Sequence, residues 1–369
     1  MGKYSNDVLN VLVAKEYELK DKWIRENYYK DLGEKEWIEK LKEEIKNILP
    51  NKKSLKLKEK LKNFNSDNFN KEKEKIQQEL EEAEGINFIV FCDEDFPKKN
   101  LQNQNLQEDY PIFLAYKGDI KLLKQERIGI AVIGLTNPTQ EIEEMEKEII
   151  KCLEDENINL VSGLAFGCDQ IAHEESLKIN LPNIAILPST IQNILPKKNQ
   201  DLANQIAQEG LLLSEYYREP KDHYEQIARY IKRDRLQALF SDMVILIASY
   251  SSKDTQKDKK LDSGAKHAMQ KAKDYGTKRA VMYDEKFAEN EMFNLNRDLI
   301  KEALEGIKET KQINEINNIN LKHKDFKILN SLWSKKILTK FIKVHNQKII
   351  DYPKGKQGTL FDSDYNALD

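Results

Sequence analysis

The sequence predicts an α/β fold in which a doubly wound, mostly parallel sheet carries helical extensions at both ends of the chain. The first observation is that short, wholly apolar segments alternate with helical segments between about residues 128 and 284. This order is typical of parallel sheets that are covered by helices on both faces. The second is that the apolar segments do not alternate with polar positions, as expected for strands buried on both sides. The chain before residue 85 and after residue 300 is instead highly charged and has helical spacing.

Composition limits the partners that the chain can have. Its 369 residues allow one large or two to three small domains. The 60 Lys and Arg residues nearly balance the 63 Asp and Glu residues, so nucleic-acid binding would have to come from a local basic patch. There is no apolar run of membrane-spanning length and no signal-peptide core. The cysteines, Cys92, Cys152 and Cys168, form no CxxC pair. We therefore expect a cytoplasmic protein with no membrane partner and no metal site.

The predicted elements follow one another in four regions. Residues 1–84 are expected to form a charged helical module that ends at Gly85, a plausible helix C-cap. Residues 85–300 are expected to form the sheet domain, which opens with extended segments at 87–93 and 109–119. Its further strands are predicted at 128–134, 158–163, 183–188, 211–215, 241–249 and 278–284. Its helices are predicted at 141–155, 169–178, 197–210, 223–240 and 263–276.

The last two regions are polar. Residues 301–350 are expected to be helical, with a closing helix at 302–318 and a packed helical pair at 326–346. The second prediction depends on the helical spacing of apolar residues such as Ile328, Leu332 and Phe341. Residues 351–369 have the composition of a flexible tail.

The stretch VSGLAFGCDQIAH, from Val161 to His173, carries the first functional signal. A strand, a turn of small residues and a helix start form a common anion-binding device, because backbone N–H groups and the helix dipole point to one place. Glycine there would let a phosphate approach the backbone closely. Spacing alone leaves open a tight turn without a ligand. Asp169 is expected to be the helix N-cap and to organise the loop, and His173 to have a structural role, since neither nucleophile nor metal ligands accompany them.

Further motifs surround this stretch in a fixed order. They are YPIFLAYKGD, IAVIGLTNPT, LPKKNQDL, LLLSE, IKRDRLQALFSDMVILIAS, SGAKHAMQKAKDYG and FNLNRDLI. Together with VSGLAFGCDQIAH, which closely matches the pattern SGLAxGxDxxAH, they resemble the motifs of the DNA-processing protein A (DprA/Smf) family over about residues 85–300. The chain is thereby identified as a divergent member of that family.

The resemblance implies a Rossmann-like fold and a function in DNA processing, recombination, uptake or defence. A member of this family binds single-stranded DNA, protects it and helps load a recombinase onto it. The resemblance implies binding and handover without turnover, so we expect no enzyme activity and no cofactor. The implied partners are single-stranded DNA and a recombinase. The family often dimerises, but the sequence locates no interface.

The resemblance also implies one crevice at the carboxyl ends of the strands. The residues expected to bind DNA or phosphate are Gly134, Ser162, Gly163, Ala165, Phe166, Gly167, Lys232, Arg233, Arg235, Ser263, Gly264 and Lys266. Those expected to support the site are Asp169, His173, Ser214 and Glu215. Arg233 and Arg235 diverge by about 200° on a helix, so only one of them is expected to face the ligand.

Three departures from the family pattern affect the charge of this crevice. Thr136 stands in the first turn, where the family carries an arginine. Asp234 stands where the family has asparagine, and its carboxylate would repel phosphate unless it pairs with an arginine. The segment 251–262 resembles an insertion whose lysines are expected to replace the lost charge, namely Lys257, Lys259 and Lys260.

The tail carries a separate signal. QGTLF at 357–361 resembles the peptide that docks in the bacterial sliding clamp. Leu360 and Phe361 would fill an apolar pocket on the clamp, and Gln357 would anchor the start of the peptide. The sliding clamp is therefore a further predicted partner.

Two other functions remain open from the sequence. One is a sensor of nucleotide derivatives, since Rossmann-like relatives bind nucleotides in this crevice. The other is a nucleoside-phosphate hydrolase of the lysine-decarboxylase-like (LOG) family. The hydrolase motif GGxGTxxE should follow the fifth strand, where this chain reads SYSSKDTQKDKKLDSG. The missing glutamate argues against hydrolysis.

Overall fold

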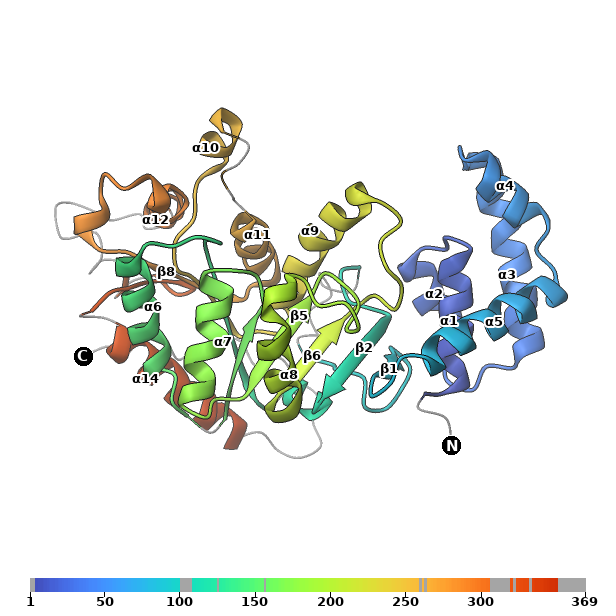
Figure 1. The fold of residues 1–369 in the computed structure, drawn as a ribbon, viewed down its shortest axis with the longest axis horizontal. Coiled ribbons are helices and arrows are strands. Elements are labelled where there is room, and N and C mark those ends of the chain that lie inside the picture. The colour runs from blue at the N-terminus through green and yellow to red at the C-terminus, as the bar shows by residue number, and fades with distance from the viewer. Residues whose placement is uncertain are drawn as a thin grey trace.

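Among the residues that the structure describes, nine strands form one sheet in the order β1-β2-β6-β5-β4-β3-β7-β8-β9 (Figure 1). This computed structural model describes residues 4–99, 108–124, 126–155, 157–258, 261, 264–305, 319–320, 323–331 and 334–350. The strands are β1 (Asn87–Val90), β2 (Phe113–Gly118), β3 (Ile128–Ile133), β4 (Ile158–Ser162), β5 (Asn183–Leu187), β6 (Leu211–Ser214), β7 (Met243–Leu246), β8 (Lys278–Met282) and β9 (Phe326–Leu329). The strands from β3 to β9 run parallel, and β1 and β2 join antiparallel at one edge. The mostly parallel sheet predicted from the sequence is confirmed.

Helices cover both faces of this sheet. They are α6 (Gln140–Lys151), α7 (Cys168–Lys178), α8 (Gln200–Glu209), α9 (His223–Leu239), α10 (Ser252–Lys257), α11 (Ala265–Tyr275), α12 (Asn294–Glu305) and α14 (Ser334–Ile350). Strand β3 shows how the faces differ. Ile130 and Val132 pack with α6, α7 and α14, whereas Ala131 and Ile133 pack with α9, α11 and α12. Successive residues of one strand thus belong to two cores, which explains why the strand is apolar throughout.

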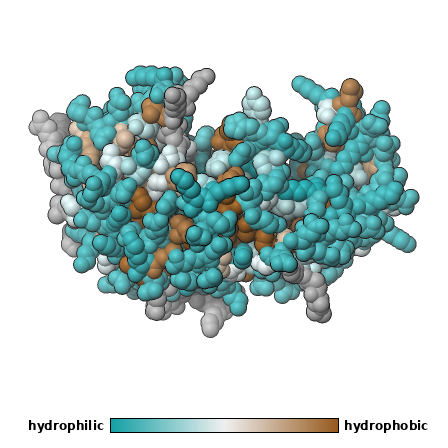
Figure 2. Space-filling view, viewed as in Figure 1, coloured by the Kyte–Doolittle hydropathy of each residue, from teal (hydrophilic) through white to brown (hydrophobic). Residues whose placement is uncertain are grey.

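Hydrophilic side chains cover most of the surface that Figure 2 shows. Within the described ranges, the large hydrophobic side chains that are exposed are Tyr29, Leu55, Phe166, Tyr224, Ile227 and Ile231. Half of this set lies on α9. No helix in the described part of the chain combines the length and the apolar character that crossing a bilayer requires.

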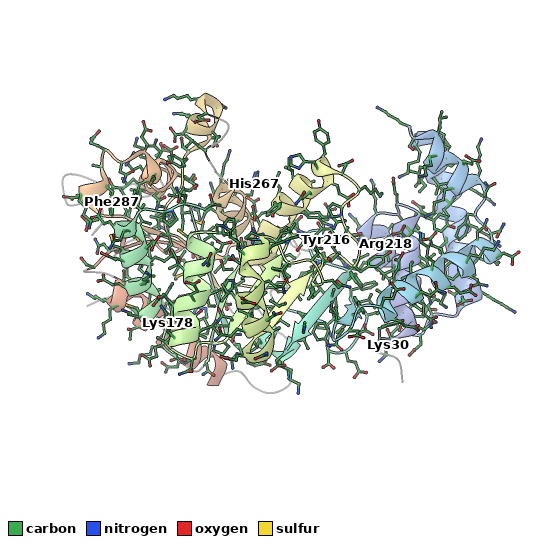
Figure 3. The ribbon with its side chains drawn as sticks, viewed as in Figure 1. Lys30, Lys178, Tyr216, Arg218, His267 and Phe287 are labelled. Carbon is green, nitrogen blue, oxygen red and sulfur yellow. The ribbon has the colours of Figure 1, made fainter. Side chains whose placement is uncertain are left out.

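Five helices precede the sheet, as the charged N-terminal segment predicted. They are α1 (Asn6–Glu16), α2 (Asp21–Asn27), α3 (Glu34–Ile48), α4 (Leu55–Lys62) and α5 (Ser66–Glu81). Arg218, which follows β6, lies between α9 and these helices (Figure 3). Its guanidinium group contacts Glu16 of α1 at 2.6 Å and Glu79 of α5 at 2.5 Å. The N-terminal helices are therefore connected by ion pairs to the segment that leads into α9.

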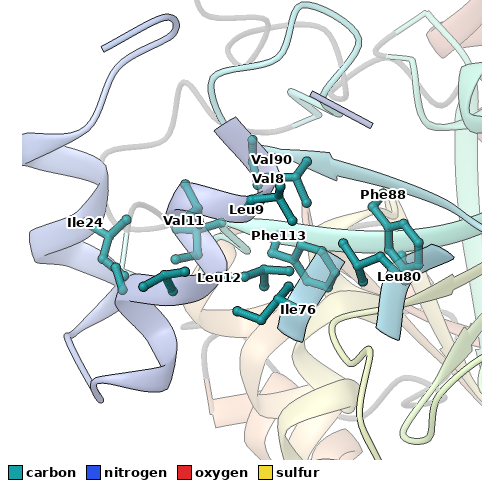
Figure 4. Packing of buried hydrophobic residues seen from close by; sticks show 14 of the residues in the cluster. Val8, Leu9, Val11, Leu12, Ile24, Ile76, Leu80, Phe88, Val90 and Phe113 are labelled. Carbon is teal, nitrogen blue, oxygen red and sulfur yellow. The ribbon is translucent and has the colours of Figure 1, made fainter. Parts of the chain in front are cut away.

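Apolar packing joins the same helices to the sheet edge. Figure 4 shows Val8 and Leu12 of α1 and Ile76 of α5 beside Phe88 of β1 and Phe113 of β2. All five side chains are at most 4% exposed. The helices predicted for residues 1–84 thus share a core with the first two strands.

The C-terminal region differs from its prediction. Residues 326–346 were expected to form a helical pair, but Phe326–Leu329 is strand β9, which extends the sheet parallel to β8. Phe326 and Ile328 face one core while Leu329 faces the other. This pairing with β8 is a tertiary effect that overrides the helical spacing of the segment. The second half, Ser334–Ile350, is helix α14 as predicted.

Candidate functional site

A cavity of about 330 Å³ lies where the order of the strands reverses. After β3 the chain continues to β4 on one side, and β7 is later added on the other side. Ligands of doubly wound sheets bind at this position, beyond the carboxyl ends of the strands. Four elements form the wall: the turn after β3, the turn after β4, helix α9 and the start of α11. The lining residues are Ile133, Gly134, Thr136, Ala165, Asp169, Ile227, Tyr230, Ile231, Arg233, Asp234, Gln237, Gly264, Ala265 and His267.

Asp169 organises the turn after β4. Its carboxylate accepts hydrogen bonds from the backbone N–H groups of Gly163 at 3.2 Å and Ala165 at 3.4 Å. Ser162 at the end of β4 donates its hydroxyl to the Val132 carbonyl at 2.7 Å. These N–H groups were predicted to bind a phosphate, but here they already have an acceptor. An anion in the cavity must therefore find other donors or displace Asp169.

The prediction that Asp169 is the N-cap of α7 was wrong by two residues. The helix begins at Cys168, and Gly167 is its N-cap with φ of 71°. A side chain at Gly167 would be strained at this φ, and a Cβ there would lie 2.3 Å from the Leu135 carbonyl oxygen. Gly167 thus serves the tight turn, which leaves Asp169 in the first helical turn with its carboxylate directed back at the loop.

The space above Gly163 is occupied by Arg233 of α9. A Cβ at Gly163 would lie 1.1 Å from Nη1 of Arg233, so only glycine accommodates the guanidinium group there. Nη1 donates to the Ile186 carbonyl at 3.4 Å and lies 3.6 Å from the Asp169 carboxylate. The sequence suggested that glycine admits a phosphate to the backbone. The structure shows that it admits an arginine, whose side chain is 6% exposed and borders the cavity.

Two further groups hold the Arg233 guanidinium. The side-chain oxygen of Gln237, in the amide orientation that satisfies both partners, accepts from Nη1 of Arg233 at 3.1 Å and from the Gly163 N–H at 3.0 Å. Asp234 lies 3.2 Å from Nε of Arg233. This is the pairing that would relieve the predicted repulsion between Asp234 and phosphate.

Arg235, two residues along α9, points into the protein instead. Its guanidinium donates to both carboxylate oxygens of Glu215 at 2.6 Å, and its Nε donates to the Asp109 carbonyl at 2.9 Å. Burial alone would raise the pKa of Glu215, but Arg235 and Lys232 lower it to about 2. Because Arg235 is bound to Glu215 and does not line the cavity, it is not among the residues that we propose contact DNA. Lys232 remains on the exposed face of α9, 3.9 Å from Glu215.

The predicted supporting residues are buried and hydrogen-bonded. Nδ1 of His173 lies 2.8 Å from Oδ1 of Asn183, and burial lowers the pKa of His173 to about 4. Ser214 donates its hydroxyl to the Ser189 carbonyl at 2.7 Å and accepts from the Tyr216 N–H at 3.0 Å. His173 is therefore neutral near pH 7 and packed into the structure, away from the lining of the cavity.

Helix α11 contributes the wall opposite the β4 turn. It begins at Ala265, and Gly264, its N-cap, borders the cavity. Lys266 points elsewhere, since its ammonium group donates to the hydroxyl of Ser252 at 2.7 Å. His267 borders the cavity, and burial together with Lys266 lowers its pKa.

Several predictions fall outside the described residues. These are Ser263 of the site, Lys259 and Lys260 of the insertion, and the clamp peptide with Gln357, Leu360 and Phe361. Lys257 is the last residue of α10. Phe166 lies on the turn after β4 and is 41% exposed. In the described ranges no three His, Cys, Asp or Glu side chains gather in a way that could hold a metal ion.

Among the residues of the cavity wall that sequence reasoning missed, four lie on α9: Ile227, Tyr230, Ile231 and Gln237. Their segment was predicted to be helical, but which face it buries depends on the sheet beneath it. A signal was present, because Tyr224, Ile227 and Ile231 recur at intervals of three and four, the spacing of one helix face.

Comparison with known proteins places this geometry in context. The family model for DNA recombination-mediator protein A matches residues 87–318. The DNA processing protein DprA of Bacillus subtilis is 31% identical over 170 residues, which cover 44% of this chain and 52% of that protein. The Streptococcus pneumoniae DprA is 35% identical over 108 residues, or 29% of this chain and 37% of that protein. The chain thus spans about half or less of the length of these curated relatives.

A solved structure shares the fold. The X-ray structure of DNA processing protein A from Streptococcus pneumoniae superposes with a TM-score of 0.60 and 19% sequence identity. The superposition covers 91% of this chain and 98% of that one. The two proteins therefore share the overall fold.

Proposed function

Because the chain belongs to the DNA recombination-mediator protein A family, we propose that it binds single-stranded DNA in the cavity at the carboxyl ends of β3 and β4. The observation that carries this proposal is the position of Arg233, whose guanidinium group is held against Gly163 in the cavity wall. Guanidinium groups bind phosphate through paired, charge-assisted hydrogen bonds. The cavity thus places a phosphate-binding group where doubly wound sheets bind their ligands.

The start of α11 supplies the second half of the proposed phosphate site. N–H groups in the first turn of a helix lack partners within the helix, and the helix dipole adds partial positive charge. Since Gly264, Ala265 and Arg233 all border the same cavity, we place the phosphate between them. This differs from the site expected in the turn after β4, whose donors Asp169 occupies.

The dimensions of the cavity favour a single strand over a duplex. A volume of about 330 Å³ suits one small ligand or one nucleotide. A flexible single strand can turn one phosphate inward, whereas the rigid backbone of a duplex cannot follow so narrow a cavity. Deep contact with few phosphates also predicts a modest dependence on salt, with a slope of about −0.7 for each phosphate contact.

Fluorescence anisotropy with a labelled oligo-dT strand and a duplex of equal length tests this proposal. We expect the single strand to bind more tightly than the duplex at every salt concentration, with an affinity that falls as salt rises. Equal binding of the two DNAs, or retention that salt does not change, would contradict the proposed site. Inorganic pyrophosphate, added as a competitor, should displace the strand if the cavity holds a phosphate.

The wider role is proposed from family membership. We propose that the bound strand is protected from nucleases and handed to a recombinase in the cytoplasm, without chemical turnover by this protein. Nuclease digestion of oligo-dT in the presence of the protein should slow, and recombinase filaments should assemble faster on the coated strand. Unchanged digestion and assembly would restrict the function to DNA binding.

The size of the cavity also supports a second candidate, a sensor of nucleotide derivatives. A volume of about 330 Å³ would enclose one nucleotide without a strand attached. Denaturing the purified protein and analysing the supernatant by mass spectrometry distinguishes the two functions. A stoichiometric nucleotide would favour the sensor, and its absence together with oligo-dT binding would favour the DNA-binding protein.

A further inference from the structure

Helix α9 exposes an apolar ridge that starts inside the cavity and runs away from it. We define the α9 ridge as Tyr224, Ile227 and Ile231, which are 83%, 45% and 47% exposed. Their spacing places them on one face of the helix. Single exposed apolar residues are ordinary, but three in line on a mostly hydrophilic surface need an explanation (Figure 2).

The ridge is continuous with the proposed phosphate site. Ile227 and Ile231 themselves border the cavity that Arg233 borders, and Tyr224 lies one turn further toward the start of α9. Lys221 and Lys232 are exposed near its two ends. A strand whose phosphate reaches Arg233 would therefore carry its neighbouring nucleotides along an apolar surface with a cation near each end.

The helix that carries the ridge is firmly held. Asp222 caps its first turn by accepting from the Glu225 N–H at 2.8 Å. Arg229, on the buried side, donates to Glu225 at 2.7 Å and to the Arg218 carbonyl at 2.7 Å. Arg218, which is labelled in Figure 3, in turn forms ion pairs with the N-terminal helices. The ridge is thus exposed on a preorganised helix, which lowers the entropic cost of binding to it.

We propose that the α9 ridge is a platform on which unpaired bases of the DNA strand stack, an inference that rests on the proposed DNA-binding function. Base faces are apolar and aromatic, and proteins that bind single strands without sequence preference stack bases on aromatic side chains such as Tyr224. Ile227 and Ile231 extend the apolar surface on which further bases would lie. From Tyr224 to Ile231 the helix rises about 10 Å, at 1.5 Å for each of seven residues. That length matches about three bases at the stacked spacing of ~3.4 Å.

The area of the ridge favours bases over a protein partner. Even an aromatic side chain buries only about 150–250 Å². Three side chains therefore fall short of the ~800 Å² that each partner contributes to a stable protein interface. A base platform needs only a few such side chains beside a phosphate site, which is the arrangement found here.

The test compares normal oligo-dT with an abasic strand of the same length and charge. In the variant Tyr224→Ala, Ile227→Ser, Ile231→Ser we expect the affinity for oligo-dT to fall about ten-fold or more. Affinity for the abasic strand should fall by much less than the affinity for oligo-dT, because Arg233 is unchanged. The matched control is Tyr29→Ala, Leu55→Ser, which removes exposed apolar side chains from the N-terminal region and should leave both affinities unchanged.

Three outcomes would overturn the platform. Unchanged affinity of the ridge variant for oligo-dT would show that bases do not contact the ridge. An equal loss for both strands would show that the ridge does not act through bases. A change in oligomeric state by analytical ultracentrifugation would make the ridge a contact between copies of the chain. Failure of the unmodified protein to bind either strand would instead refute the proposed function, so the two ideas fail separately. Circular dichroism and the urea midpoint confirm that the variant is folded.

Discussion

Helix α9 carries two arginines that are two residues apart and lie in two differently built regions. Arg235 makes two hydrogen bonds of 2.6 Å to the buried carboxylate of Glu215. Arg233 makes contacts of 3.1 to 3.6 Å with Gln237, Asp234, the Ile186 carbonyl and Asp169, and it borders a cavity. One guanidinium group is saturated with partners inside the protein. The other is held by longer contacts and borders a cavity, and this difference separates a structural arginine from the one that we propose binds the ligand.

The comparison predicts that the two arginines affect different properties. Removing one partner of a buried ion pair leaves an uncompensated charge, so Arg235→Ala should lower the free energy of unfolding by about 3–5 kcal/mol. Urea unfolding followed by circular dichroism measures this loss. Arg233→Ala should lower the free energy of unfolding by clearly less than Arg235→Ala does. The double replacement Arg235→Met, Glu215→Leu should recover stability, because it removes both charges. Equal destabilisation by the two arginine variants would contradict the proposed difference between Arg233 and Arg235.

Lowering the pH should remove the stabilisation that Glu215 contributes through its ion pair with Arg235. The pKa of Glu215 is about 2 in the folded protein and about 4.3 in an unfolded chain. A carboxyl group with a lowered pKa stabilises the fold above the unfolded value, and this contribution disappears as the pH falls through the folded value. At pH 5 the free energy of unfolding of the unmodified protein should therefore exceed that of Glu215→Gln by about 3 kcal/mol. This difference should disappear as the pH falls toward 2. A gap that does not change with pH would refute this assignment.

Gly163→Ala probes the Arg233 region without touching a charge. The added Cβ would collide with Nη1 of Arg233, which lies at the end of a flexible side chain and would move away. We expect the affinity for oligo-dT to fall about ten-fold, which corresponds to the loss of one charge-assisted contact at ~1.5 kcal/mol. The double variant Gly163→Ala, Arg233→Ala should bind no more weakly than Arg233→Ala alone. Additive losses would show that Gly163 acts independently of the arginine.

Thr136→Arg tests the cavity by adding a positive charge to its wall. Thr136 borders the cavity at the turn after β3. A new cation there should raise the affinity for oligo-dT a few-fold at low salt and steepen the salt dependence by about 0.7. Thr136→Gln is the neutral control of similar reach. A gain that is equal for both variants would show that charge at this position is not what matters.

The sequence was a sufficient guide to the central fold because its strands are buried on both faces. Segments such as 128–133 and 158–162 are apolar throughout, and the helices between them have clear periodicity. Strand β9 was missed because four residues are too few to show a strand period, and its state depends on pairing with β8. Parallel topology also predicts a crevice beyond the carboxyl ends of the strands, and a cavity lies there after β3 and β4.

The contents of the site could not be predicted in the same way. Gly163 and Arg233 are far apart in the sequence, and no local pattern shows that one makes room for the other. The helical geometry did predict that Arg233 and Arg235 diverge. Which of them faces inward depends on Glu215, at the end of another strand. Long-range side-chain contacts thus decided the roles that spacing left open.

The central claim is that Arg233 in the cavity binds the DNA strand. Its most direct test is the dissociation constant for oligo-dT, measured at fixed salt for the unmodified protein and for Arg233→Ala. Lys178→Ala on the exposed face of α7 is the control for a lost surface cation. We expect Arg233→Ala to weaken binding at least ten-fold while Lys178→Ala leaves it unchanged, with both variants folded. Equal affinity of Arg233→Ala and the unmodified protein would contradict the account.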